Sequence, residues 1–223
     1  MSEALLDCVE IEPRNAARSA VIWLHGLGAD GHDFESIVPQ LGVDAEHAVR
    51  FIFPHAPKRP VTINGGFVMP AWYDIRAMSL SRDVDEQGVR ESEKHIHALI
   101  SRENERGIPA RRTVLAGFSQ GGAMALHVGL RYRERLAGIV ALSTYLVCGE
   151  SLEDERSEAN SDVPIFQGHG SMDPMVLPEA GRLAHDRLTS LGYTVVFKAY
   201  RMGHEVHPEE IVDVGNALNE MLG

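Results

Sequence analysis

Ser119 is the first of three residues whose types and order suggest nucleophilic catalysis. It lies at the centre of a Gly-x-Ser-x-Gly pattern, residues 117–121, between a short apolar run and a good helix start. Such a strand–turn–helix arrangement, called a nucleophile elbow, exposes the serine hydroxyl at a sharp turn. Gly117 and Gly121 suit this turn, because a Cβ at either position would collide with neighbouring backbone. The five-residue pattern alone is a weak signal, so the rest of the chain must supply a base and an acid.

A base and an acid for Ser119 follow two later strands. A serine hydroxyl is a poor nucleophile at neutral pH and needs a base within hydrogen-bond reach. Asp173 comes after the predicted strand 163–167, and His204 after the predicted strand 193–200. His204 would take the serine proton and return it to the leaving group, while Asp173 would orient the imidazole and stabilise the imidazolium. The chain order Ser, Asp, His is that of the α/β-hydrolase architecture.

The glycine-rich loop that follows the predicted strand 20–24 is a candidate oxyanion hole. It begins His25-Gly26-Leu27-Gly28. The natural donors to a tetrahedral oxyanion are the backbone N–H groups of Leu27, in this loop, and of Gln120, directly after the serine. Loss of one such donor typically removes about 3–4 kcal/mol of transition-state stabilisation. Four chemical groups are therefore expected after four strands.

Other histidines and aspartates fit this scheme less well. His169 is a rival base, but it precedes the acid and follows the wrong strand. Asp162 falls before its strand and Asp186 lies within a predicted helix. Only two residues separate His204 from His207, so this segment is not the zinc motif His-Glu-x-x-His, and no third ligand is evident. We expect no metal and no other cofactor, and we expect His207 to start the last helix.

Strands and helices alternate along the chain. The predicted strands cover residues 4–11, 20–24, 49–53, 113–117, 138–142, 163–167 and 193–200. The predicted helices are an amphipathic one with Phe34, Ile37, Val38 and Leu41, a long one over about 83–104, and others starting after Ser119, at Pro178 and at Pro208. Residues 54–81 look irregular, with a small hairpin formed by 61–63 and 67–69, and residues 144–162 look polar and irregular.

This alternation predicts an α/β fold. With no repeat and no linker, we expect one domain over residues 1–223, built on a mostly parallel twisted sheet with helices on both faces. In such sheets the ligand binds beyond the carboxyl ends of the strands. The four groups named above all come directly after strands, as this rule requires. Only about twenty residues separate the strand ending near Leu142 from the next, too few for a helical cap domain.

Composition excludes several classes of function. Of the 223 residues, 44% are hydrophobic and 24% charged, which are ordinary values for a soluble globular protein. The net charge of −11 argues against nucleic acid and against an anionic membrane surface as partners. Cys8 and Cys148 do not make a disulfide framework, and we assign neither a role. No signal peptide or membrane span is visible, so we expect a cytoplasmic protein without membrane insertion.

Several motifs, spread nearly end to end, make the chain resemble the carboxylesterase and acyl-protein thioesterase family, also described as the phospholipase/carboxylesterase group. They are residues 25–30 (HGLGAD), 54–57 (PHAP), 71–74 (AWYD), 117–122 (GFSQGG), 142–145 (LSTY), 169–174 (HGSMDP) and 203–204 (GH). The resemblance implies hydrolysis of carboxylic esters, thioesters or lysophospholipids. It places the catalytic roles on Ser119, Asp173 and His204, and the oxyanion donors on Leu27 and Gln120.

The resemblance carries two finer implications and one departure. Thr144-Tyr145 resembles the bacterial esterase branch more than the eukaryotic thioesterases, and the family makes a homodimer plausible. The polar stretch 149–162 is richer in Glu and Asp than the more apolar loop expected there, which leaves the acyl preference open.

An uncapped site should be open to solvent and lined by apolar side chains from the loops around it. Candidates for an acyl groove are Leu27, Met69, Trp72 and Val176, with Phe67 and Met175. The alternative is that Trp72 and Phe67 only pack their own long loop. We therefore expect a serine carboxylesterase for short to medium acyl chains on small molecules, or an enzyme that acts on acylated proteins or lysophospholipids. A non-catalytic binding protein and a serine peptidase are the other interpretations.

Overall fold

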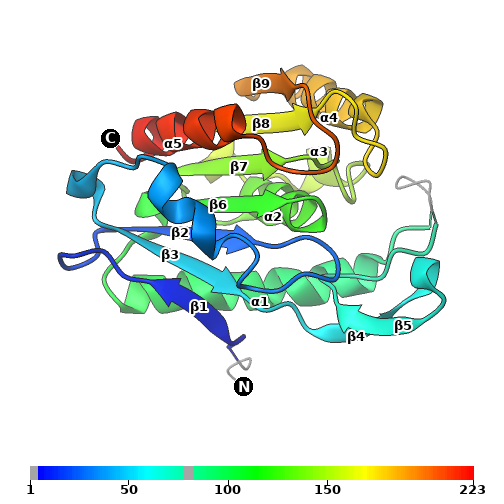
Figure 1. Ribbon diagram of the computed structural model, residues 1–223, viewed down its shortest axis with the longest axis horizontal. Helices are drawn as coiled ribbons and strands as arrows, with labels where there is room; N and C mark the ends of the chain where they lie inside the picture. The colour runs from blue at the N-terminus through cyan, green and yellow to red at the C-terminus, as the bar shows by residue number, and fades with distance from the viewer. Residues whose placement is uncertain (1–4, 78–82) are drawn as a thin grey trace.

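A seven-stranded sheet forms the centre of the computed structural model, which describes residues 5–77 and 83–223 (Figure 1). The strands are β1 (Cys8–Ile11), β2 (Ser19–Leu24), β3 (Val49–Pro54), β6 (Thr113–Phe118), β7 (Gly138–Leu142), β8 (Ile165–Gly170) and β9 (Val195–Tyr200). Their order is β1-β3-β2-β6-β7-β8-β9. β1 is antiparallel to β3 and the other neighbours are parallel. The expected mostly parallel sheet is confirmed.

Helices cover both faces of this sheet. On one face lie α1 (Glu86–Glu105), α2 (Gln120–Arg131) and α4 (Pro178–Ser190), and on the other lie α5 (Pro208–Leu222) and the short 3₁₀ helix η1 (Glu35–Gln40) (Figure 1). Shorter pieces are α3 (Leu152–Glu155) and the 3₁₀ turns η2 (Ala45–His47), η4 (Ala110–Arg112) and η5 (Glu158–Asn160). The predicted three-layer arrangement of helices around a sheet is therefore confirmed.

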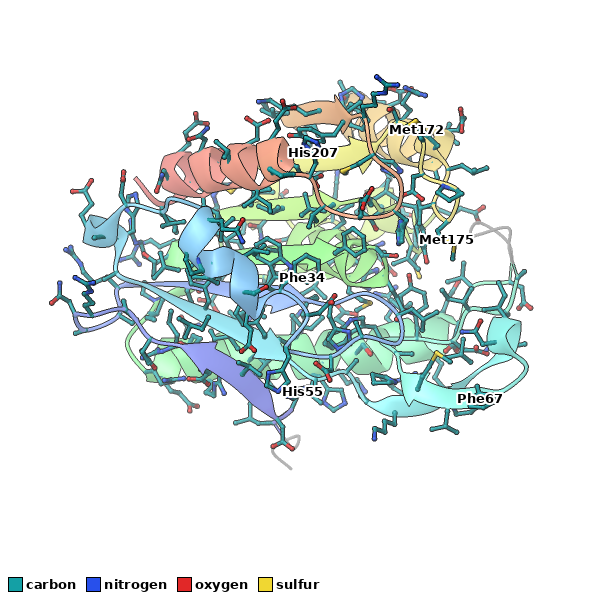
Figure 2. All side chains as sticks on the ribbon, viewed as in Figure 1. Phe34, His55, Phe67, Met172, Met175 and His207 are labelled. Carbon is teal, nitrogen blue, oxygen red and sulfur yellow. The ribbon has the colours of Figure 1, made fainter. Side chains whose placement is uncertain are left out.

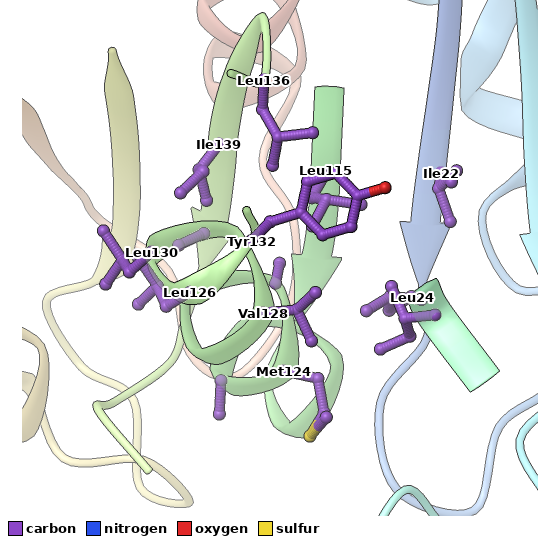
Figure 3. Packing of buried hydrophobic residues seen from close by; sticks show 14 of the residues in the cluster. Ile22, Leu24, Leu115, Met124, Leu126, Val128, Leu130, Tyr132, Leu136 and Ile139 are labelled. Atoms are coloured by element: carbon purple, nitrogen blue, oxygen red, sulfur yellow. The ribbon is translucent and has the colours of Figure 1, made fainter. Parts of the chain in front are cut away.

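β2 shows why a continuous apolar run becomes a central strand. Ile22 and Leu24 pack into the core beneath α1 and α2, while Val21 and Trp23 pack into the core beneath α5 and η1. All four side chains are at most 1% exposed. Burial of one such side chain contributes about 1.5–3 kcal/mol. Figure 3 shows the first of these cores, where Leu24 faces Met124 and Val128 of α2, so β2 and the helix that follows Ser119 share one core.

One local prediction was wrong, and a second was wrong only in the bounds of one strand. The segment after the glycine-rich loop is not an α-helix but η1, since Pro39 inside it has no N–H to donate to a helical hydrogen bond. The hairpin is present, but its strands are β4 (Lys58–Val61) and β5 (Phe67–Pro70), and residues 62–64 form a 3₁₀ turn, η3 (Thr62–Asn64). The Asp74 carboxylate accepts hydrogen bonds from the backbone and the hydroxyl of Thr62 at 2.7 and 2.6 Å. These bonds bend the chain at the place where an extended strand was expected.

Cys8 and Cys148 are free and half-buried. Burial raises the pKa of both thiols, that of Cys8 to about 11, so neither is a thiolate at neutral pH. Across residues 5–77 and 83–223, no helix has both the length and the apolar character needed to cross a membrane.

Candidate active site

The turn at Ser119 has the strained backbone of a nucleophile elbow. Ser119 joins β6 to α2 with φ of 54°, a left-handed conformation that L residues rarely adopt. A Cβ on Gly117 would lie 2.3 Å from the backbone of Gly121, and one on Gly121 would lie 2.1 Å from the carbonyl oxygen of Leu24. The steric need for both glycines is confirmed. Strain of this kind costs about 1–3 kcal/mol and persists only where the surrounding structure imposes it.

The end of the neighbouring strand β7 holds this turn from the side. The backbone N–H of Ser119 donates to the carbonyl oxygen of Leu142 at 2.8 Å. The hydroxyl of Thr144 donates to the carbonyl oxygen of Ser119 at 2.6 Å. Both contacts come from the end of β7, so the elbow is anchored on the sheet as well as on α2.

The structure brings Ser119, His204 and Asp173 into one hydrogen-bonded chain. His204 Nε2 lies 3.0 Å from Ser119 Oγ, and His204 Nδ1 lies 2.7 Å from Asp173 Oδ2. Asp173 is 2% exposed, so its carboxylate fixes the imidazole with Nδ1–H as donor. Nε2 is then free to accept the hydroxyl proton of Ser119. The ring of Phe118 lies 4.8 Å from the imidazole and packs against it.

A tight turn after β8 aims the Asp173 carboxylate. Its other oxygen, Oδ1, accepts hydrogen bonds from the backbone N–H groups of Met175 and Val176 at 2.8 and 3.0 Å. His169, the rival base, lies buried behind this turn, where its Nε2 is 2.9 Å from the carbonyl oxygen of Val176. Burial lowers the pKa of His169, so its ring is neutral at physiological pH. His169 supports the acid and makes no hydrogen bond to Ser119.

The glycine-rich loop after β2 passes directly over the elbow. A Cβ on Gly26 would lie 3.6 Å from the Cβ of Ser119. In the described part of the chain, the backbone N–H groups of Leu27 and Gln120 donate to no other protein group. His25 braces the loop, with Nδ1 2.7 Å from the carbonyl oxygen of Gly26, while its Nε2 accepts from a backbone N–H at 3.1 Å. Burial lowers the pKa of His25, which keeps this bracing imidazole neutral.

Trp72 supports this loop and does not line a groove. Its side chain is 0% exposed, which contradicts the prediction that it contacts an acyl chain. The indole Nε1–H donates to the carbonyl oxygen of His25 at 2.9 Å. The Gln120 side chain accepts from the backbone N–H of Trp72 at 2.9 Å and donates to the carbonyl oxygen of Tyr73 at 2.8 Å. These supporting roles of Trp72 and Gln120 were not found from sequence, because nothing in the spacing of residues 72 and 120 marks them as neighbours.

The remaining candidates for the acyl groove differ in how much of their side chain is exposed. Val176 is 5% exposed and contributes its backbone to the Asp173 turn, so its side chain offers little surface to a substrate. Leu27 and Met69 are half-buried. The Met69 side chain lies beside the glycine-rich loop, with its sulfur 3.6 Å from the position of a Cβ on Gly28. Phe67 is 75% exposed and lies on β5, at the same end of the molecule as Met175 (Figure 2). Phe67 therefore does not pack its own loop.

A groove of about 1080 Å³ adjoins the catalytic chain on the side of α4. Apolar residues in its lining include Tyr145, Leu146, Met175, Leu177 and Leu183. It starts beside the site, because Tyr145 follows Thr144, which binds Ser119, and Met175 binds Asp173. The charged residues of the lining are Asp83, Glu86, Glu150, Glu179 and Arg187. Of the predicted groove residues only Met175 lines it, and neither Ser119 nor His204 does.

The two histidines of the segment 204–207 have separate tasks. His204 uses one ring nitrogen for Ser119 and the other for Asp173. His207 is the N-cap of α5, and its Nδ1 accepts from the backbone N–H of Glu209 at 3.3 Å. The expectation that His207 starts the last helix is confirmed, and its imidazole is occupied by the helix end.

Comparison with known proteins agrees with this geometry. The model of the phospholipase/carboxylesterase family matches residues 6–222 of the chain. The chain belongs to this family. Members of the phospholipase/carboxylesterase family share the α/β-hydrolase fold found here, and the protein is a hydrolase of that superfamily.

Two named relatives and two solved structures extend over nearly the whole chain. Acyl-protein thioesterase 1 of Neurospora crassa is 43% identical over 213 residues, which cover 92% of this chain and 87% of the relative. Acyl-protein thioesterase 1 of Cryptococcus neoformans is 38% identical over 231 residues, with 96% and 97% covered. The crystal structure of Arabidopsis thaliana SOBER1 has a TM-score of 0.86 at 34% identity and covers 93% of this chain and 100% of that one. That of Zea mays acyl-protein thioesterase 2 has a TM-score of 0.86 at 31% identity, with 97% and 99% covered.

Proposed function

We propose that this member of the phospholipase/carboxylesterase family is a serine esterase that works through an acyl-enzyme. Ser119 is the nucleophile, His204 the general base and acid, and Asp173 the residue that orients it. The observation that carries the proposal is the continuous hydrogen-bonded chain from Ser119 Oγ through the imidazole to Asp173, with separations of 3.0 and 2.7 Å. A merely structural serine has no need of a base held by a buried carboxylate.

The reaction proceeds in two halves. Ser119 Oγ attacks the carbonyl carbon of the substrate as its proton passes to His204 Nε2, and the carbonyl becomes a tetrahedral oxyanion. The N–H groups of Leu27 and Gln120 stabilise that oxyanion. Collapse expels the alcohol or thiol, which takes the proton from His204 and leaves the acyl group on Ser119. Water then attacks this ester with His204 again as base, and the free acid leaves.

For the substrate we infer acyl esters of short to medium chain, with the acyl chain in the groove beside α4. The support is the set of apolar side chains in the lining of the groove, and the position of two of its lining residues: Tyr145 follows the Thr144 that binds Ser119, and Met175 donates to Asp173. Acyl-protein thioesterase is the second candidate, favoured by relatives of that name at 38–43% identity. Both substrates fit one mechanism, because a thiol replaces the alcohol only as the leaving group.

The test of the proposed chemistry is turnover of p-nitrophenyl esters by Ser119→Ala. We expect turnover to fall by about 10⁶-fold, the effect of removing such a nucleophile, with an unchanged circular dichroism spectrum. Ser36→Ala, an exposed serine on η1, is the matched control and should keep wild-type turnover. Wild-type turnover by Ser119→Ala would refute the assignment.

The substrate is tested by comparing kcat/KM across p-nitrophenyl esters of increasing acyl length and across S-acylated peptides. A maximum at short to medium oxygen esters would support the first candidate. A preference of about ten-fold or more for the S-acylated peptides would support the thioesterase. Measurable cleavage of peptide amides at a comparable rate would favour a peptidase and contradict both.

A further inference from the structure

Glu210 is a buried carboxyl group that the proposed reaction does not use. It is the third residue of α5 and is 0% exposed. Neither carboxyl oxygen reaches a hydrogen-bond partner among the described residues. A buried polar group without a partner lowers the stability of the fold by a few kcal/mol, so its presence needs an explanation.

Two glycines on β8 explain where this carboxyl group sits. Gly168 and Gly170 are two residues apart, so they point to the same face of the sheet, the one covered by α5. A Cβ on Gly168 would lie 2.1 Å from Glu210 Oε1, and one on Gly170 would lie 2.2 Å from the carbonyl oxygen of Gly203. The Glu210 carboxyl group thus fills the space that a side chain at position 168 would take, and the backbone of Gly203 fills the corresponding space at position 170. Gly203 and Glu210 therefore both lie against bare backbone of β8.

The same carboxyl group faces the end of the loop that carries His204. His207 and Glu210 hold the N-cap and third positions of α5, the pair of positions that form a capping box. The backbone N–H of His207 is near enough to the Glu210 carboxyl group to lower its pKa, although the two groups do not have the geometry of a hydrogen bond. The loop therefore lies against β8 at Gly203, and its other end at His207 lies beside the Glu210 carboxyl group.

The surroundings of this carboxyl group favour its uncharged form. Burial and, to a smaller extent, the charge of Asp213 raise the pKa of Glu210, the His207 N–H lowers it, and the net value is about 8. The other titratable groups on the packed elements offer no counter-ion. Lys198 and Tyr200 of β9 both bind Asp213, His169 of β8 lies on the opposite face of the sheet, and Glu35 of η1 has its own ion-pair partner.

We propose that Glu210 is a positioning residue for His204. Its uncharged carboxyl group, seated against Gly168, fixes residues 203–207 on β8 and holds the imidazole within hydrogen-bonding distance of Ser119. When the carboxyl group ionises, a charge without a counter-ion lies against the backbone of β8, and the first turn of α5 moves away with the loop. The inference rests on the proposed function, since it concerns the base of that reaction.

The test is the pH profile of kcat and kcat/KM for p-nitrophenyl ester hydrolysis by the intact protein, between about pH 6 and 9.5. For the wild type we expect kcat to fall with a midpoint near 8, the pKa of Glu210. Glu210→Gln has the same shape but cannot ionise, so it should keep kcat within about two-fold at pH 7 and lose the alkaline fall. The exposed neighbour Glu209 gives the matched control, because Glu209→Gln should follow the wild-type profile. Circular dichroism at each pH verifies that the protein stays folded.

A second variant separates positioning from simple stabilisation. In Glu210→Ala we expect kcat to fall about ten-fold or more with KM changed less than about two-fold, because the base is displaced and the groove is not. A flat wild-type profile up to pH 9.5, or a folded Glu210→Gln that keeps the alkaline fall, would overturn the proposal. The pH profile of the wild-type protein tests the proposal even if one of the variants does not fold. Wild-type turnover by Ser119→Ala would instead refute the proposed function itself.

Discussion

The side-chain oxygen of Gln120 accepts a hydrogen bond from the backbone N–H of Trp72 at 2.9 Å. Gln120 therefore has two functions. Its backbone N–H is a proposed oxyanion donor, while its side chain ties the start of α2 to the loop at residues 72–73. Trp72 in turn contacts the glycine-rich loop, since its indole N–H donates to the carbonyl oxygen of His25 at the start of that loop.

Replacement of Gln120 by Leu should lower kcat although the proposed backbone donor stays. The change leaves the Trp72 N–H and the Tyr73 carbonyl buried without partners, at about 1–3 kcal/mol each. We expect kcat for p-nitrophenyl esters to fall by about 10- to 100-fold as the oxyanion loop shifts. Gln87→Leu, on the exposed face of α1, is the control. Equal kcat in the two variants would contradict the supporting role.

Asp173→Asn should be far more harmful than Asp186→Asn. An amide at 173 can donate to His204 Nδ1, which favours the tautomer with a proton on Nε2 and no lone pair for Ser119. Such a change lowers kcat by about 10⁴-fold in a Ser-His-Asp enzyme. Asp186 lies exposed on α4, so its variant should keep wild-type kcat. Steady-state kinetics of both variants checks the prediction, and similar losses would remove the special role of Asp173.

Glu210 should make the fold less stable as pH rises. Its pKa is about 8 in the folded protein and 4.5 in the unfolded chain, so between these values only the unfolded chain has released the proton. The free energy of unfolding therefore falls through this window, by several kcal/mol at most, and the loss is complete above pH 8. Glu210→Gln should have a higher free energy of unfolding than the wild type at pH 9, and the difference between the two proteins should be smallest near pH 4.5. Urea unfolding at several pH values measures this, and a pH-independent difference would contradict it.

The parts of the fold that follow from short-range patterns could be predicted from sequence. The run from Ala20 to Leu24 is apolar at every position, as in a strand buried on both faces, and it forms β2. Ser119, Asp173 and His204 each follow a strand, and the parallel sheet brings the carboxyl ends of those strands together. Their proximity in space is a consequence of the topology, which the alternation of strands and helices predicts.

Features that depend on long-range packing could not be predicted. Trp72 looked suited to bind an apolar chain, yet its indole is drawn inward by a carbonyl group 47 positions away. Glu210 has the residue type and the position of a favourable charge in the first turn of a helix, yet the glycine at 168 gives its side chain a place against the sheet. In both cases the deciding partner comes from a distant strand or loop, and the residue type alone suggests the more common solvent-exposed role.

Reaction with a fluorophosphonate followed by mass spectrometry tests the central claim most directly. The reagent modifies a serine only where a base and an oxyanion hole activate it, so it reports the assembled site and needs no natural substrate. We predict one adduct per chain, on the peptide that contains Ser119, absent from Ser119→Ala and formed at least about 100-fold more slowly in His204→Ala. An adduct on another serine, or none in the folded wild-type protein, would contradict the account.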